Sequence, residues 1–187
     1  MHLAAEFGMI KMIKLLVENH AEVDAVDWHN FTPLHYAAKK GYGKVSQALL
    51  ENQATVNVLD QYKNTPLHHA SFYGHENTVN VLLQYGANID PLNEDKCTPL
   101  FLAVEKGHTN VTRVLIEYNA SIDICVSGNM TPLHKAAMEG HSDIVRLLLE
   151  HKGKFSLNMV SLKLGASYIQ TEIRINIFFK NCLWATN

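Results

Sequence analysis

Cysteine is scarce in this sequence, and its spacing implies neither a disulfide framework nor a metal site. Cys97, Cys125 and Cys182 are widely separated, odd in number and form no Cys-x-x-Cys pair. This usage is typical of a reducing compartment. The first residues also lack the basic and apolar regions of a secretory signal. We therefore expect a cytoplasmic protein.

Long hydrophobic runs and an excess of one charge are also missing. No apolar stretch reaches the roughly eighteen residues that a membrane-spanning helix needs. The 16 basic side chains nearly balance the 18 acidic ones, so charge gives no reason to expect nucleic acid or an anionic membrane as the main partner. The hydrophobic fraction of 47% is that of a globular chain rather than a disordered one.

Motifs of catalysis are absent as well. The sequence contains no glycine-rich phosphate loop, no Gly-x-Ser-x-Gly and no His-Glu-x-x-His. Asp24, Asp90 and Asp123 recur at one position of a repeating pattern, where aspartate is a turn former before it is half of an acid–base pair. We expect no enzymatic activity and no cofactor.

The sequence does contain a repeat of 33 residues. Thr-Pro-Leu begins at four positions with this spacing, namely Thr32, Thr65, Thr98 and Thr131. Three copies continue as Thr-Pro-Leu-His-x-Ala, and the copy at Thr98 carries Phe101 in place of histidine. The chain begins inside a further copy, because Met1, His2 and Ala4 fall at the Leu, His and Ala positions of the motif.

Two other sets of residues keep the same period. They are Gly8, Gly41, Gly74, Gly107 and Gly140, and Leu16, Leu49, Leu82, Leu115 and Leu148. Together with the motif they resemble the ankyrin repeat over about residues 1–153. The resemblance implies an all-α repeat solenoid of stacked helix-turn-helix units with β-hairpin fingers, plus a non-repeat C-terminal tail. It divides the array into a truncated repeat, 1–29, and repeats 30–62, 63–95, 96–128 and 129–153.

Each recurring feature of the motif also has a physical role. The Thr hydroxyl can accept from an unpaired amide of the first turn, and proline after it has its φ set for a helix start. The glycine can adopt a positive φ and end the first helix. A second apolar run at helical spacing follows, such as residues 78–83. One such unit cannot bury its own apolar face, so neighbouring units must stack.

Both ends depart from the pattern. The first repeat lacks its Thr-Pro, which suggests a fragment, an internal start or an incomplete gene product. Neither end shows a polar cap, and an uncapped end can promote self-association. In the tail, 154–187, the alternating stretch from Ile169 to Ile177 is β-prone and aggregation-prone. We expect a poorly ordered tail or the out-of-frame end of an alternative transcript; a partner-binding extension and a packed cap are the alternatives.

The glycine that the family places in the finger, two residues before each Thr, is replaced throughout. Its positions hold Asn30, Lys63, Lys96 and Asn129. Asparagine tolerates the left-handed conformation better than lysine does. We therefore expect strain, or a different turn geometry, at Lys63 and Lys96.

Seven of the eleven histidines fall on repeat positions. They are His2, His35, His68, His75, His108, His134 and His141. The resemblance implies that they bond to backbone groups between repeats rather than to a metal. His68 and His69 are adjacent and not four residues apart, so they do not make a helical ligand pair. We expect no metal site.

The resemblance places the binding surface on the finger tips and on the first helix of each repeat, which line a concave groove. Aromatic residues gather at these positions in the second and third units, and aromatic side chains dominate binding hot spots. The candidate partner-binding residues are Trp28, Tyr36, Tyr62, His69, Phe72 and Tyr73. The alternative is that these side chains only pack against the adjacent repeat.

The sequence thus favours a non-catalytic module or adaptor that binds another protein. The alternative is a fragment of a larger ankyrin-containing protein, such as a channel, a kinase, a ubiquitin-ligase adaptor or a pore-forming toxin. An enzyme formed by the tail and the array is disfavoured, because residues 154–187 are too few for a core of their own. The partner and the oligomeric state do not follow from the fold, because one scaffold serves many unrelated complexes.

Overall fold

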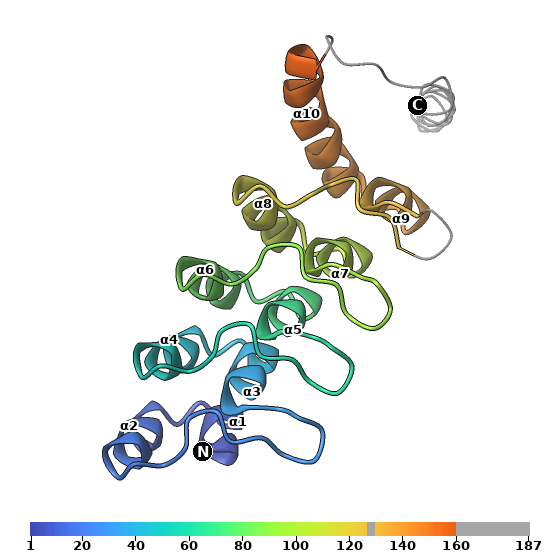
Figure 1. Cartoon of the computed structure of the whole chain (residues 1–187). Coiled ribbons are helices and arrows are strands. Elements are labelled where there is room, and N and C mark those ends of the chain that lie inside the picture. Colours follow the sequence, from blue (N-terminus) through green and yellow to red (C-terminus); the bar gives the residue numbers. More distant parts are fainter. Residues whose placement is uncertain (127–129, 160–187) are drawn as a thin grey trace. The chain divides into compact units, whose positions relative to one another are not determined.

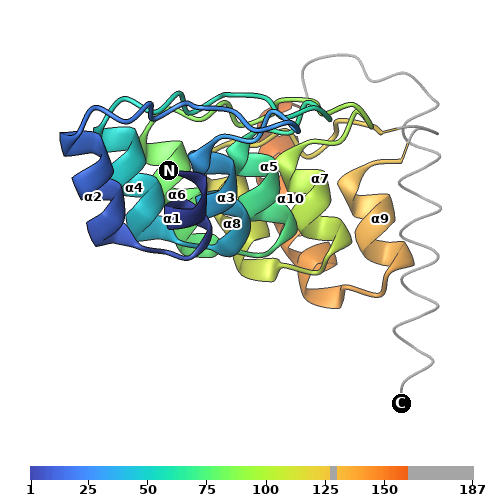
Figure 2. The same cartoon turned by 90° about the horizontal axis from the view of Figure 1, so that it is seen from below.

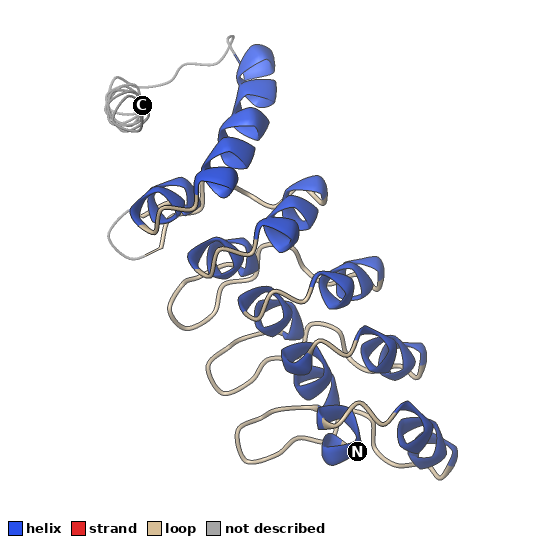
Figure 3. Cartoon of the chain, turned by 180° about the vertical axis from the view of Figure 1, so that it is seen from behind, coloured by secondary structure: helices blue, strands red, loops and turns tan. Residues whose placement is uncertain are grey.

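The computed structural model describes residues 1–126 and 130–159, and these residues contain ten helices and no strand (Figure 1; Figure 3). The helices are α1 (His2–Glu6), α2 (Ile10–Glu18), α3 (Pro33–Lys40), α4 (Gly43–Glu51), α5 (Pro66–Phe72), α6 (Glu76–Gln84), α7 (Pro99–Glu105), α8 (Thr109–Glu117), α9 (Pro132–Met138) and α10 (Ser142–Met159). Each repeat contributes two helices, so the predicted all-α repeat solenoid is confirmed.

The helices form two layers within residues 1–149. Odd-numbered helices stack in one row and even-numbered helices in the other, with α3 against α1 and α5, and α4 against α2 and α6 (Figure 1; Figure 2). The leucines of the repeat fill the core, each at most 1% exposed: Leu34, Leu49, Leu67, Leu82, Leu100 and Leu115. Because each repeat buries its apolar side against the neighbouring repeats, the contacts between repeats hold the array together.

In the four repeats that contain Thr-Pro, the first helix begins as the motif predicts. The side chain of Thr65 accepts the amide of His68 (3.4 Å), and the amide of Thr65 donates to His68 Nδ1 (3.0 Å). The same reciprocal cap forms at the starts of α3 and α9. In α7, Phe101 offers no acceptor, and only the bond from its amide to Thr98 Oγ1 remains (3.1 Å). The histidine of the motif is therefore a capping residue.

Glycine ends α3 for two separate reasons. Gly41 has a φ of 79°, which side chains with a Cβ rarely adopt. A Cβ at this position would also lie 2.5 Å from Nδ1 of His75 in the next repeat. The ring of His75 is fixed there by a hydrogen bond from its Nε2 to the carbonyl oxygen of Lys39 (3.0 Å).

The connectors between repeats form fingers, but these are not the β-hairpins that the resemblance implied. A backbone hydrogen bond closes each finger, between residues 27 and 31, 60 and 64, 93 and 97, and 126 and 130. In the first three fingers a second bond forms the turn at the tip, from the amides of Asn30, Lys63 and Lys96 to the carbonyl oxygens of Asp27, Asp60 and Asn93. Among the described residues, only Val126 and Met130 form a β-bridge. In the first finger, Asp27 Oδ1 accepts the amides of His29 and Phe31, both at 2.9 Å. The carboxylate thus takes amides that a strand ladder would otherwise pair.

The residues that replace the finger glycine adopt the left-handed conformation. Asn30, Lys63 and Lys96 have φ values of 58°, 58° and 60°. The prediction of strain at the two lysines is confirmed in this sense, because a residue with a Cβ costs about 1–2 kcal/mol in this region. Asn129 lies outside the part of the chain that the structure describes.

The chain divides into a unit from Met1 to Leu149 and a second from Glu150 to Asn187. The predicted boundary at 153 falls within α10, which continues to Met159. The predictions for the tail beyond this helix, residues 160–187, lie outside the described residues. The division into array and tail stays a prediction.

Candidate functional site

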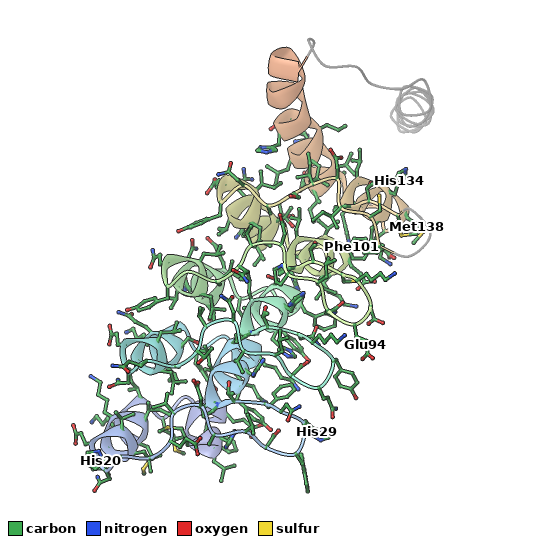
Figure 4. All side chains as sticks on the ribbon, viewed as in Figure 1. His20, His29, Glu94, Phe101, His134 and Met138 are labelled. Carbon is green, nitrogen blue, oxygen red and sulfur yellow. The ribbon has the colours of Figure 1, made fainter. Side chains whose placement is uncertain are left out.

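Neighbouring fingers are joined at their tips by backbone hydrogen bonds. The amide of Gln61 donates to the carbonyl oxygen of His29 (3.0 Å), and the amide of Glu94 donates to that of Tyr62 (2.9 Å). His29 Nδ1 also bonds Gln61 Oε1 (3.2 Å). His29 and Glu94 lie on the loops that project beside the odd-numbered helices (Figure 4). The first three fingers therefore form one connected surface rather than independent loops.

Three of the six candidate residues are exposed on this side of the array. Trp28 and Tyr62, on the first two fingers, are 89% and 55% exposed, and Tyr73, at the end of α5, is 43% exposed. Phe72 is half-buried: its ring meets the ring of Tyr73 edge-on at 5.0 Å, and the ammonium of Lys106 lies 4.6 Å from its centre. Exposed aromatic side chains on an ordered surface are typical of binding sites.

The other two candidate residues tie a finger to the helix behind it. Tyr36 Oη donates to Asp27 Oδ2 (2.8 Å), and His69 Nε2 donates to Asp60 Oδ2 (2.8 Å). Both pairs are nine residues apart and occupy the same positions of successive repeats. For Tyr36 and His69 the structure thus shows contacts within the array, as in the packing alternative.

The ties keep their partners in complementary protonation states. Burial raises the pKa of Tyr36 to about 12, and the hydrogen bond to the Asp27 carboxylate adds to this effect. Burial alone would raise the pKa of Asp27, but the bonds from Tyr36 and from two backbone amides hold it below its usual range. The pKa of the buried Asp60 is likewise lowered, because bonds from His69 and Asn64 outweigh desolvation. The first two fingers therefore each rest on a charged carboxylate.

The buried motif histidines are neutral. Burial lowers the pKa of both His35 and His68 to about 4. Each ring uses Nδ1 as the cap acceptor and donates from Nε2, His35 to the carbonyl oxygen of Asn64 and His68 to that of Cys97, both at 3.1 Å. A protonated ring could not accept the cap bond, so neutrality is a condition of this arrangement.

The prediction that repeat histidines bond to the backbone of another repeat is confirmed for six of the seven. These are His2, His35, His68, His75, His108 and His141. His134 bonds Thr131 within its own repeat. Within residues 1–126 and 130–159, no three His, Cys, Asp or Glu side chains form a group that could hold a metal ion. No helix of that part is long and apolar enough to cross a membrane.

The aspartates assigned to turns also link repeats. Asp24 Oδ2 accepts the amide of Thr55 (3.0 Å), and Asp90 Oδ1 accepts the amide of Ser121 (3.1 Å). Each bond crosses 31 residues into the next repeat. The carboxylates therefore do more than form turns, and their recurrence at one position of the 33-residue repeat was the signal for this role.

Sequence reasoning missed a hub around Phe31. Its ring contacts the rings of His35, Tyr36 and His69 at 5.2, 5.3 and 5.0 Å, and the ammonium of Lys39 lies 5.7 Å from its centre. The equivalent positions in later repeats are Asn64, Cys97 and Met130, so no repeated pattern marks this residue. Phe31 connects the first finger to both α3 and α5.

A row of exposed aliphatic side chains was missed as well, although the sequence contains its signal. Val26, Leu59 and Leu92 lie 33 residues apart on three fingers and are 57%, 50% and 50% exposed. Each of them directly precedes the residue whose amide donates the hydrogen bond that closes its finger. The fingers therefore present apolar side chains in addition to Trp28 and Tyr62.

The comparison with known proteins agrees with this architecture. A family model described as ankyrin repeats in three copies matches residues 1–93 and again residues 86–159. No curated protein matches the chain. Ankyrin repeats are a generic protein–protein interaction module, and the family is generally non-catalytic. Because the matched residues make up far more than half of the 187, the chain belongs to the ankyrin-repeat family.

Proposed function

We propose that this chain is a non-catalytic adaptor or scaffold of the cytoplasm. It binds another protein through its finger tips and the exposed side of the odd-numbered helices. The observation that carries the proposal is the placement of Trp28, which is 89% exposed at the tip of a finger. Leaving such a large apolar side chain in water has no structural benefit, whereas burying it against a partner removes much apolar surface from water.

The order of the fingers supports the same conclusion. The ties from Tyr36 and His69 and the bonds between finger tips fix the backbone before a partner arrives. A surface that is already ordered loses little conformational entropy on binding. Aromatic side chains have few rotatable bonds, so they add contact area at a low entropic cost. Trp28, Tyr62 and Tyr73 are therefore the residues from which we expect most of the binding energy.

The test is a quantitative affinity capture with the full chain as bait. The finger variant combines Trp28→Ala, Tyr62→Ala and Tyr73→Ala. The control variant combines Tyr85→Ala and Tyr118→Ala, which remove rings that are 39% and 40% exposed, close to the value for Tyr73, at the ends of α6 and α8. Circular dichroism must show unchanged helix content in both variants.

A partner held by the parent and the control variant but lost by the finger variant supports the proposal. Once it is purified, its dissociation constant should rise at least thirtyfold in the finger variant, which corresponds to about 2 kcal/mol for hot-spot truncation. Equal retention by all three baits would place the binding surface elsewhere on the array. If no bait retains a partner, the alternative of a larger ankyrin-containing protein gains support.

A further inference from the structure

The exposed aliphatic side chains on the first three fingers point away from the helices. Val26, Leu59 and Leu92, here called the apolar stripe, are at least half exposed, at 57%, 50% and 50%. Asp27 and Asp60 directly follow the first two, and their carboxylates accept hydrogen bonds from side chains of α3 and α5. Because neighbouring side chains of an extended arm point to opposite sides, the apolar stripe lies on the side of the fingers turned away from these helices.

The spacing of the apolar stripe follows from the way the fingers are joined. The two arms of the first finger are joined by the bond from the amide of Asp27 to the carbonyl oxygen of Phe31, and the next finger is joined by the bond from the amide of Gln61 to that of His29. Arms paired in this way lie about 4.8 Å apart, so two arms give a step of about 10 Å. The packing of α3 against α5 agrees, because packed helices lie about 8–10 Å apart.

This step matches a helical partner and not an extended one. Seven residues of an α-helix make about two turns, rise about 10.5 Å and return to the same face. In an extended chain, residues on one face lie about 6.7 or about 13 Å apart, so no pair matches the step. A helix across the fingers can therefore place three apolar residues, seven apart, against Val26, Leu59 and Leu92 in turn.

The connectors that lead into the fingers carry charge of one sign only. They follow the even-numbered helices and comprise residues 21–26, 54–59, 87–92 and 120–125 (Figure 2). They contain no Lys, Arg or His, and their acidic residues are Glu22, Asp24, Asp90 and Asp123. The chain as a whole is nearly balanced, with 16 basic and 18 acidic side chains. The charge beside the apolar stripe is thus complementary to a basic partner.

We propose that the apolar stripe is a second docking surface, which binds an amphipathic helix of another protein with apolar residues seven apart and Lys or Arg beside them. Exposed apolar side chains in a row, unlike single ones, are typical of interaction sites. Tyr73 lies at the end of α5, on the other side of the fingers. The chain then offers separate surfaces to two partners, and this proposal and the proposed function can fail independently.

The test is the fluorescence anisotropy of a labelled synthetic peptide titrated with the full chain. The peptide is an alanine-based helix of about 20 residues with leucine at every seventh position and lysine flanking each leucine. A second peptide of the same composition has its leucines five residues apart, which spreads them around the helix. We expect the first peptide to bind at least tenfold more tightly than the second. Equal binding of the two peptides, or no binding of either, would overturn the proposal.

Variants of the chain locate the binding. Leu59→Ser should raise the dissociation constant of the first peptide at least tenfold, because Leu59 lies at the centre of the apolar stripe. The matched control is Leu149→Ser, which removes a leucine that is 42% exposed on α10 and should leave binding unchanged. The combination of Tyr62→Ala and Tyr73→Ala should also leave it unchanged. A loss of binding in this combination, or none in Leu59→Ser, would contradict a second surface.

The charge requirement is tested by Asp24→Asn combined with Asp90→Asn, which removes two charges and keeps the acceptor oxygens. Asn57 already occupies the equivalent position of the second connector, and its Oδ1 accepts the amide of Asn88 (2.8 Å). The variant should weaken binding of the lysine peptide at least threefold and flatten its dependence on salt. Glu76→Gln, at the opposite end of α6 from the connector, is the control and should change neither. Unchanged affinity in the aspartate variant would contradict a basic partner.

Discussion

The third and fourth repeats begin with the same Thr-Pro-Leu, yet they are joined to their neighbours by different kinds of contact. In α5, His68 caps the helix and reaches the carbonyl oxygen of Cys97 in the next repeat. In α7, Phe101 occupies the equivalent position at 4% exposure and can do neither. The repeat therefore needs a large buried side chain at this point, and a polar bridge can be replaced by apolar packing.

The fingers beside α5 and α7 also differ in that an ionisable pair in one is replaced by a neutral pair in the other. Asp60 holds the second finger against α5 through His69, whereas the equivalent pair in the next repeat is Asn93 and Leu102. Asn93 instead donates from Nδ2 to Asn64 Oδ1 of the previous finger (2.9 Å). His68 of the third repeat and Asp60 of the finger before it are buried and ionisable, whereas the equivalent residues one repeat later are Phe101 and Asn93. Acid should therefore destabilise the contacts of the third repeat more than those of the fourth.

Acidification should have the largest effect. The folded-state pKa of His35 and His68 is about 4 against an ordinary value of 6.5, so the unfolded chain binds more protons between these values and stability falls as pH drops. A shift of this size corresponds to about 3 kcal/mol per histidine. The lowered pKa of Asp60 adds a further loss only at more acidic pH. Urea unfolding from about pH 7 to about pH 4 measures this loss.

The fourth repeat provides the control for this titration. Replacing His68 by phenylalanine gives α5 the residue that α7 already has, and it removes one of the two titrating rings. The slope of unfolding free energy against pH should then fall by roughly half. An unchanged slope would show that the acid sensitivity arises elsewhere.

At neutral pH, the same variant, His68→Phe, should lower the free energy of unfolding by about 2–3 kcal/mol, which is less than the loss expected on acidification. The amide of Thr65 and the carbonyl oxygen of Cys97 both lose a partner in a buried setting. His134→Phe is the matched substitution at the motif position of α9, where the ring is half-buried and, within the described residues, bonds only Thr131 of its own repeat. We expect a smaller loss there, measured by urea unfolding; equal losses would contradict the role assigned to the bridge between repeats.

His69→Leu should have a smaller effect again, because it copies Leu102 of the fourth repeat. The carboxylate of Asp60 loses one bond but keeps the amides of Tyr62 and Asn64. We expect a loss of about 1–2 kcal/mol in unfolding free energy. In a double-mutant cycle with Asp60→Ala, most of this loss should vanish, since the two residues act as a pair. Additive losses would show that the tie is not the source of the effect.

Most of the features compared here could be predicted from the sequence, but some could not. The period of 33 residues predicted the helices and their caps, and the resemblance to the ankyrin repeat added the left-handed finger positions and the histidine bonds, because each depends on one residue type at a fixed place. The pairs Asp27–Tyr36 and Asp60–His69 escaped prediction although they recur, because tyrosine and histidine do not look alike in a pattern search. Tyr36 and His69 share only a hydrogen-bond donor that reaches the aspartate nine residues earlier.

Which side of each helix the neighbouring repeat covers was not predicted, because that information lies in the packing between helices. Phe31 shows the opposite limit: its ring joins three others, yet no other repeat has an aromatic residue at that position. Comparison of equivalent positions in the repeats identifies the residues that recur. Features that belong to one repeat alone, such as the ring of Phe31, lie at positions that do not recur, and this comparison misses them.

Lys63→Gly and Lys96→Gly should produce the smallest effects, and these should be stabilising. Both lysines have a positive φ, so glycine relieves a steric cost of about 1–2 kcal/mol while adding backbone entropy to the unfolded chain. We expect a net gain of about 0.5–1 kcal/mol in each repeat. Lys44→Gly, at an exposed helical position of α4, should instead lose about 1 kcal/mol. Asp60 lies three residues before Lys63, and Asn93 lies three residues before Lys96. Equal gains in the two variants would therefore show that the turn is the same in both fingers, with or without a carboxylate.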